Sequence, residues 1–402
     1  MLSNNIRPWR QINELHLHVT TACNLRCGYC YADTDVKNRG RVMSDEMARA
    51  AIDEVLDQTD ASVIQIIFHG GEPLLRSESF YENICAYAEA RARNKGLGLS
   101  FGMQTNLTLL TETMADLLSK YRVKIGTSID GPQNIHNSYR GLYSAVINGV
   151  ALAKRFGIFC GPIVVVHRHN YDRMKDVLDN FRELGIFSVH CNVGAAVGRG
   201  TKTLQRLNAK QIFIAFSEIF EYMLSNDFAI VDTRVLMMVE RQIYRRYSQD
   251  RALLNCSTPF CHAGITLIAV DVDGSVFPCG CASADDSLMP FRIAQIGSRA
   301  SYDRDRLLRF HEKPTTYETI CADCPARFVC YHGCPAFDAT DAETAFSICQ
   351  SNRLFHDFLS TRSSDIQRYR TFLENQGINR RGHNQNSDGR TEINHCSLGK
   401  HN

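Results

Sequence analysis

The chain has 402 residues, of which 44% are hydrophobic and 22% are charged, and its formal net charge is +2. This composition is typical of a globular protein, and the length favours two domains over one small core. The small charge favours neither nucleic acid nor an anionic membrane as a partner, and without a signal-like or membrane-length apolar run we expect a cytoplasmic protein.

The first half of the sequence alternates short apolar runs with amphipathic segments, as expected for β–α repeats. We expect strands over residues 14–20, 63–68, 97–104, 123–128, 158–167 and 187–193. We expect helices over residues 44–56, 77–95, 111–119, 142–155 and 172–184. Six buried strands in β–α units predict a parallel sheet with right-handed crossovers. The predicted fold is therefore α/β, an open, partial (β/α)6 TIM barrel rather than a closed eight-fold one.

A polar or glycine-containing stretch follows each of these six strands. The stretches begin at Cys23, Gly70, Gln104, Ser128, Arg168 and Gly194. The carboxyl ends of parallel strands meet at one edge of a sheet, and active sites of such folds lie at that edge. We therefore expect these stretches to form one site.

The stretch after the first strand contains three cysteines, Cys23, Cys27 and Cys30, at the spacing C-x3-C-x2-C. Thiolates are the ligands that iron–sulfur clusters select, and three on one loop can hold three corners of a four-iron cluster. The fourth iron then remains open to a ligand that is not protein. A structural zinc site is the alternative, but it needs four protein ligands, and no fourth Cys or His follows at finger-like spacing.

The triad resembles the signature of the radical S-adenosylmethionine (radical SAM) superfamily, with Tyr29 in the aromatic position of that signature. The resemblance implies that S-adenosylmethionine (SAM) binds the open iron. Gly70, Gly71 and Glu72 match the GGE motif, which holds the methionine amino group in the family. Glycines also let the backbone approach a ligand closely.

Further strand-end residues acquire predicted roles from the same resemblance. Ser128 and Asp130 lie where family members bind the ribose and neighbouring groups, and Gln104 and Asn106 are expected beside them. Arg140 lies where an arginine often meets the methionine carboxylate, a contact that suits a guanidinium fork. Taken singly, each of these residues could instead be a turn glycine, a helix cap or a solvated surface arginine.

Nine of the 16 cysteines lie between residues 256 and 349. A reducing cytoplasm disfavours disulfides, so clustered cysteines indicate metal ligands or catalytic groups. The spacing C-x2-C-x5-C-x3-C that begins at Cys321 resembles the SPASM extension, in which family members bind two auxiliary four-iron clusters. Zinc ribbons are the structural alternative, but the N-terminal triad makes iron–sulfur clusters the consistent interpretation.

The auxiliary ligands follow from that resemblance by position. One cluster takes Cys321, Cys324, Cys330 and Cys349. The other takes Cys261, Cys279 and Cys334, with a fourth ligand assigned to Cys256, for which Cys281 competes. With the triad this makes three [4Fe-4S] clusters. Cys85, Cys160 and Cys191 are expected to be buried hydrophobes, and Cys396 is expected to bind nothing.

The resemblance implies an oxidoreductase that takes a hydrogen atom from a carbon in a side chain of a ribosomally made precursor peptide, with a one-electron reductant such as flavodoxin or ferredoxin. A cyclophane carbon–carbon crosslink is favoured, and a thioether is the other crosslink considered. Sulfatase-maturing relatives carry an acidic base directly after the hairpin cysteine, where this protein has Gly280. Asp285 or Asp286 could replace it, so oxidation of the sulfatase-maturase kind remains an alternative, as does a non-catalytic iron–sulfur protein for electron transfer or binding.

We expect three segments. Residues 1–235 form the radical SAM partial barrel, and residues 236–361 form bridging helices and the SPASM domain with its hairpin around Asp273-Gly274. Residues 362–402 form a polar tail, of which 382–402 are predicted to be disordered. We expect no separate N-terminal module for a leader peptide. The sequence does not identify the substrate peptide, the modified residue or the oligomeric state.

Overall fold

The computed structural model of this protein describes residues 8–32, 40–244, 261–282, 290–298, 301–312, 315–327, 330 and 334–375. The barrel strands are β1 (Glu14–Thr20), β2 (Val63–Gly70), β3 (Gly98–Thr105), β4 (Lys124–Ser128), β5 (Cys160–Val166) and β6 (Ser188–Val193). Each pairs in parallel with the next, which confirms the predicted parallel sheet. The strand ends lie within two residues of the predicted ones, a normal uncertainty for element ends.

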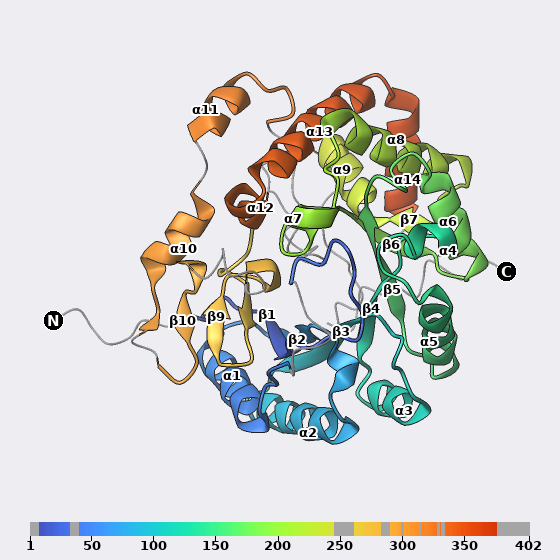
Figure 1. Ribbon diagram of the computed structural model, residues 1–402. Helices are drawn as coiled ribbons and strands as arrows, with labels where there is room; N and C mark the ends of the chain where they lie inside the picture. Colours follow the sequence, from blue (N-terminus) through green and yellow to red (C-terminus); the bar gives the residue numbers. More distant parts are fainter. Residues whose placement is uncertain are drawn as a thin grey trace.

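Helices connect these strands, and α1, α2, α3 and α5 lie along the outer side of the curved sheet (Figure 1). The connecting helices are α1 (Asp45–Gln58), α2 (Glu78–Asn94), α3 (Glu112–Lys120), α5 (Tyr143–Arg155), α6 (Met174–Glu183) and α8 (Ala209–Ser225). Short helices follow three strands: η1 (Pro73–Leu75) after β2, α4 (Gln133–His136) after β4 and α7 (Gly200–Thr203) after β6. Ser44, Ser77 and Thr111 cap α1, α2 and α3, because each hydroxyl accepts a hydrogen bond from the third backbone N–H of its helix.

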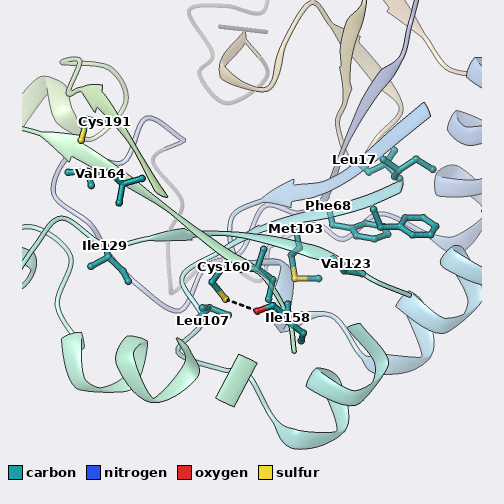
Figure 2. Close-up of a cluster of buried hydrophobic side chains, with 14 of the residues drawn as sticks. Leu17, Phe68, Met103, Leu107, Val123, Ile129, Ile158, Cys160, Val164 and Cys191 are labelled. Atoms are coloured by element: carbon teal, nitrogen blue, oxygen red, sulfur yellow. Dashed lines mark hydrogen bonds between the residues drawn. The ribbon is translucent and has the colours of Figure 1, made fainter. Parts of the chain in front are cut away.

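One face of the sheet packs against these helices. Figure 2 shows this core, with one side chain from each of five strands: Leu17, Phe68, Met103, Val164 and Cys191. Each such side chain contributes about 1.5–3 kcal/mol when fully buried. Because side chains alternate along a strand, the intervening residues face the barrel interior instead. The prediction that Cys85, Cys160 and Cys191 are buried is confirmed.

The C-terminal hairpin extends the barrel sheet. β8 (Leu267–Val270) pairs in parallel with β1, and β9 (Ser275–Phe277) and β10 (Ala294–Gln295) follow in antiparallel order. With β7 (Val231–Asp232) beside β6, the described strands form a ten-stranded sheet in the order β10-β9-β8-β1-β2-β3-β4-β5-β6-β7. The sequence predicts the hairpin but not its pairing with β1, which saturates backbone groups that would otherwise form an open edge.

The remaining helices belong mainly to the C-terminal part. They are α9 (Thr233–Tyr244), α10 (Arg304–His311), α11 (Thr315–Ala322), α12 (Pro335–Thr340) and α13 (Ala342–Ser360), with the short η3 (Gly280–Ala282) after the hairpin. Within the described ranges, no helix is both long enough and apolar enough to cross a bilayer.

Helix α14 (Ser363–Asn375) occupies the start of the segment predicted to be a polar tail. Tyr369 and Leu373 are fully buried, and the Tyr369 ring centroid lies 4.9 Å from that of Phe220 and 4.7 Å from that of Phe228. The prediction of a tail from residue 362 is corrected accordingly, because a few apolar residues at helical spacing suffice to dock this polar segment. The segment 382–402, predicted to be disordered, lies outside the described residues.

Replacing Tyr369 tests whether α14 is part of the folded core. We expect Tyr369→Ala to lower the free energy of unfolding by about 3–5 kcal/mol, because a large buried ring leaves a cavity. Glu374→Ala, at an exposed position of the same helix, should change it by less than about 0.5 kcal/mol. Urea unfolding of the reconstituted protein under anaerobic conditions measures both values, and equal small effects would place this segment outside the core.

Candidate functional site

The cysteine triad lies on the loop that directly follows β1. Cys23, Cys27 and Cys30 are all partly buried, and the Leu25 backbone N–H lies 3.4 Å from the Cys23 sulfur. The pKa of Cys23 is raised to about 12, mainly by burial and also by the nearby charges of Glu72 and the other two thiols. The three sulfurs therefore share one region, and their mutual repulsion as thiolates calls for a positive partner.

The donor set of this loop fits an iron–sulfur cluster. Clustered thiolates are the soft ligands that such a cluster selects. Among the described residues, no three His, Cys, Asp or Glu side groups stand close enough to hold a single metal ion. A four-iron cluster does not require that spacing, because each thiolate binds a different iron.

The Gly70-Gly71 turn packs directly against the residues that lead into the triad. A Cβ on Gly70, whose φ is 121°, would lie 2.3 Å from the Thr20 carbonyl oxygen, and one on Gly71 would lie 2.0 Å from that of Ala22. The Gly71 N–H donates to Thr20 O at 2.8 Å, and the N–H of the next residue donates to Ala22 O at 2.8 Å. Glycine is therefore required at both positions by close backbone approach.

Glu72 ties this turn to the end of β3. Its carboxylate is buried and accepts hydrogen bonds from the Thr105 hydroxyl at 2.5 Å and from the backbone N–H groups of Leu74 and Asn106 at 2.9 and 2.8 Å. Burial raises the pKa of Glu72, and these three donors oppose that rise. The carboxylate thus fixes the geometry of the glycine turn, while its predicted contact with methionine stays a prediction.

Polar groups of β3 and β4 meet beside the triad. Asn106 donates to Asn24 Oδ1 at 2.9 Å, and its amide nitrogen lies 4.0 Å from the Cys23 sulfur. Gln104 donates to Ser128 Oγ at 3.3 Å. The structure therefore brings these predicted cofactor residues to the same edge of the sheet as the triad.

A buried ion pair lies on the other side of the triad loop. Asp130 is fully buried and accepts from Arg140 Nε at 2.9 Å, from the Tyr29 hydroxyl and from the Val165 N–H at 3.0 Å. Burial acts to raise the pKa of Asp130, but Arg140 and His167 hold it well below its usual range. Both carboxylate oxygens are engaged within the protein, so Asp130 positions Arg140 and Tyr29.

Arg140 connects this ion pair to the triad. Its guanidinium lies 4.9 Å from the Tyr29 ring centroid, a cation–π arrangement. Burial raises the pKa of Cys27, and the charge and hydrogen bond of Arg140 act to lower it again. The arginine is thus a buried positive charge directed at a triad sulfur.

The loop after β6 holds the triad loop through its backbone. Arg199 Nη1 donates to Cys27 O at 3.0 Å, and the Arg199 N–H donates to Cys30 O at 2.9 Å. The Thr203 hydroxyl donates to the carbonyl of Gly28. The sequence indicates this loop only by its position after a strand, because nothing in the spacing of Arg199 reveals its partner.

The C-terminal cysteines fall into the two groups expected from the sequence. The pKa of Cys349 is raised to about 12, mainly by burial and also by the nearby thiols of Cys330, Cys321 and Cys324. The pKa of Cys334 is likewise raised to about 12, mainly by burial and also by the thiols of Cys279 and Cys261. Each group fits the donor set of an iron–sulfur cluster.

Two cysteines compete for the fourth ligand position of the second group, Cys256 and Cys281. Cys256 lies outside the described residues. Cys281 packs with Cys261, Cys279 and Cys334 against one small apolar cluster that includes Phe277 and Phe310.

A single carboxylate connects the barrel edge to the helix that carries Cys349. Asp341 caps α13 and accepts from the Ala196 N–H at 2.6 Å and from Arg206 Nε at 2.7 Å. Ala196 belongs to the same loop that holds the triad backbone. The sequence does not reveal this role of Asp341, because Ala196 and Arg206 are more than a hundred residues away in the sequence.

Comparison with known proteins identifies the barrel. The family model described as the radical SAM superfamily matches residues 17–181. This protein has a radical SAM domain. The matched segment runs from β1 through α6 and includes the triad, the glycine turn and the Asp130–Arg140 pair.

Two relatives with named activities are anaerobic sulfatase-maturating enzymes. The serine-type anaerobic sulfatase-maturating enzyme of Bacteroides thetaiotaomicron is 33% identical over 176 residues, which is 41% of this chain and 42% of that protein. The cysteine-type enzyme of Clostridium perfringens is 24% identical over 369 residues, covering 86% of this chain and 96% of the relative. The match therefore spans less than half the length of the Bacteroides relative. The expected radical SAM class is confirmed for the barrel domain.

Solved structures share the fold. Native anSMEcpe with bound AdoMet and Cp18Cys peptide aligns with a TM-score of 0.72 and 22% identity, over 89% of this chain and 99% of that one. Streptococcus suis SuiB bound to precursor peptide SuiA aligns with a TM-score of 0.54 and 17% identity, over 80% of this chain and 72% of that one. These matches confirm the α/β radical SAM fold.

Proposed function

We propose that this protein uses SAM to abstract a hydrogen atom from a carbon in a side chain of a ribosomally made precursor peptide and installs a crosslink. The proposal rests on the contacts that hold the triad loop in place. The Gly70-Gly71 turn, Arg140 and Arg199 hold this loop from different sides at the carboxyl edge of the sheet. Held in this way, the loop presents the sulfurs of Cys23, Cys27 and Cys30, which bind three irons of one cluster.

The strand-end residues supply a binding surface for SAM beside that cluster. Gly70 and Gly71 offer close backbone approach, which Glu72 and Asn106 maintain. Arg140 offers a guanidinium to a carboxylate. Gln104 and Ser128 offer polar groups at the same edge, while Tyr29 and Asp130 hold Arg140 in place.

When bound, the reduced cluster and SAM supply a 5′-deoxyadenosyl radical that takes the hydrogen atom, with electrons from a one-electron reductant such as flavodoxin or ferredoxin. The two C-terminal cysteine groups hold auxiliary [4Fe-4S] clusters in a SPASM domain, one on Cys321, Cys324, Cys330 and Cys349 and one on Cys261, Cys279, Cys334 and Cys256. The protein itself orients these groups and shields them from water.

A peptide substrate is supported by the solved structures, since anSMEcpe is seen with the Cp18Cys peptide and SuiB with the precursor peptide SuiA. We favour a carbon–carbon crosslink because the position after Cys279 is Gly280, which offers no acidic group. The second candidate is oxidation of a peptide residue. It is favoured by the match to the Clostridium sulfatase-maturating relative, which covers 86% of this chain and 96% of the relative. Mass spectrometry of the modified peptide separates them: a hydrazide-reactive carbonyl marks oxidation, and loss of two hydrogens with fragmentation blocked between two residues marks a crosslink.

A SAM-cleavage assay tests the catalytic proposal. Anaerobically reconstituted wild-type protein should form 5′-deoxyadenosine with dithionite, and Cys27→Ala should reduce this to background because the cluster loses a ligand. Cys85→Ala is the matched control, since Cys85 is buried in the apolar core and lies far from the triad in the sequence, and it should retain activity. Wild-type protein that binds stoichiometric zinc, or that forms no 5′-deoxyadenosine with any reductant, would refute the proposal.

Iron counting tests the fourth auxiliary ligand. Cys256→Ala should lose about one third of the iron and sulfide, since one of three four-iron clusters loses a ligand. Cys281→Ala should keep all of it. The reverse result would give the ligand role to Cys281, which already packs beside Cys261, Cys279 and Cys334.

A further inference from the structure

The inner face of β1 carries a row of polar residues that none of the roles above uses. Glu14, His16 and His18 alternate with buried apolar residues and so face the barrel interior. At about 3.3 Å per residue, the row leads from the triad loop to His16 over roughly 13 Å. It therefore extends from the expected SAM site toward the C-terminal hairpin.

The lower end of this row meets the turn that carries an auxiliary cysteine. A Cβ placed on Gly280 would lie 3.1 Å from His16 Nδ1 and 3.4 Å from His18 Nε2. Gly280 directly follows Cys279. The two imidazoles thus face the position at which this protein lacks an acidic group.

A third histidine, on the neighbouring strand β2, stacks against these two rings. The ring centroid of His69 lies 5.1 Å from that of His18 and 5.9 Å from that of His16, and the rings are stacked. His69 directly precedes the Gly70-Gly71 turn. Burial lowers the pKa of His18 to about 3 and that of His69 well below its usual value, so both rings are neutral near pH 7.

His16 differs from its neighbours in having a carboxylate partner. Its Nε2 lies 2.6 Å from Glu14 Oε1, and the two residues are about 15% exposed. A carboxylate accepts, so the hydrogen in this contact is on Nε2, and Nδ1 is the ring nitrogen left to accept a proton. Within the described residues, Nδ1 is buried and has no hydrogen-bond partner. A carboxylate that orients an imidazole is the usual arrangement for a histidine base.

We propose that His16, oriented by Glu14, is the general base that takes the proton lost by the peptide after its radical forms. The inference rests on the proposed peptide-modifying function. It is based on the position of His16 Nδ1, which has no hydrogen-bond partner among the described residues and lies beside Gly280, between the expected SAM site and the auxiliary cysteine Cys279. Asp285 and Asp286, the other candidates from the sequence, lie outside the described residues.

Atoms and electrons balance in this step. A C–H bond of the peptide breaks, and its hydrogen atom goes to the 5′-deoxyadenosyl radical. The carbon radical forms a bond to an aromatic ring carbon. That ring carbon then releases its proton to His16 Nδ1 and one electron to an oxidised auxiliary iron–sulfur cluster, which restores aromaticity. Glu14 stabilises the imidazolium that forms.

His16→Gln in the reconstituted enzyme tests the proposal. With the precursor peptide, we expect about a 100-fold loss of crosslinked product, the usual size for a missing general base. Iron content and 5′-deoxyadenosine formation should stay near wild-type values, and deuterium from the labelled peptide carbon should still appear in 5′-deoxyadenosine. His190→Gln is the matched control, because His190 is a half-buried histidine on β6 whose nitrogens bond Thr233 and Asn192, and it should keep product formation.

A second readout needs no turnover. Binding of the precursor peptide to reconstituted His16→Gln, measured by calorimetry without reductant, should match that of the wild-type protein, because the base acts only after the radical forms. Glu14→Gln should lower the yield of crosslinked product with the same unchanged peptide binding, because the carboxylate no longer orients the imidazole.

The outcomes separate the two claims. Wild-type rates of product in His16→Gln would overturn the base assignment, and so would loss of iron and 5′-deoxyadenosine in that variant, which would mark a structural role. An equal loss in His190→Gln, or weaker peptide binding in His16→Gln, also counts against it. A wild-type protein without 5′-deoxyadenosine would instead contradict the proposed function.

Discussion

The pairing of β1 on both edges is the constraint on which the rest of the structure depends. β1 pairs in parallel with β2, which ends at the glycine turn, and with β8, which leads into the hairpin of Cys279. The triad loop begins where β1 ends, and the Glu14–His16 pair lies on its inner face. A shift of register on either edge would displace the two cysteine regions relative to each other, because one residue of slip turns every side group to the opposite face.

The triad loop itself owes its shape to packing rather than to regular secondary structure. Asp130 and Arg140 form a buried pair whose disruption by loss of one partner would cost about 3–5 kcal/mol, since a charge would be left buried alone. Their cost of burial is offset by hydrogen bonds from Tyr29 and Val165. A buried pair of this kind holds the loop in one geometry, because moving either residue would leave a charge buried alone.

The sequence predicts the parts of this molecule that follow from local pattern. The alternation of strands and helices predicts the parallel sheet, and the resemblance to the SPASM extension implies the two C-terminal cysteine groups. Contacts between distant segments escape it: the β1–β8 pairing, the hydrogen bond of Arg199 to Cys27, and the Asp341 cap depend on three-dimensional proximity. The sequence does not reveal helix α14, because most of its residues are polar and only Tyr369 and Leu373 are buried in the described structure. His16 and His18 look like ordinary strand residues until Gly280 is seen beside them.

Whether Cys23, Cys27 and Cys30 hold one cluster with an iron open to SAM can be measured by electron paramagnetic resonance of the dithionite-reduced, reconstituted protein. Adding SAM should shift the signal of one cluster in the wild-type protein and leave the others unchanged, and it should cause no such shift in Cys27→Ala. A wild-type spectrum that SAM does not alter would show that these cysteines do not hold a cluster open to SAM.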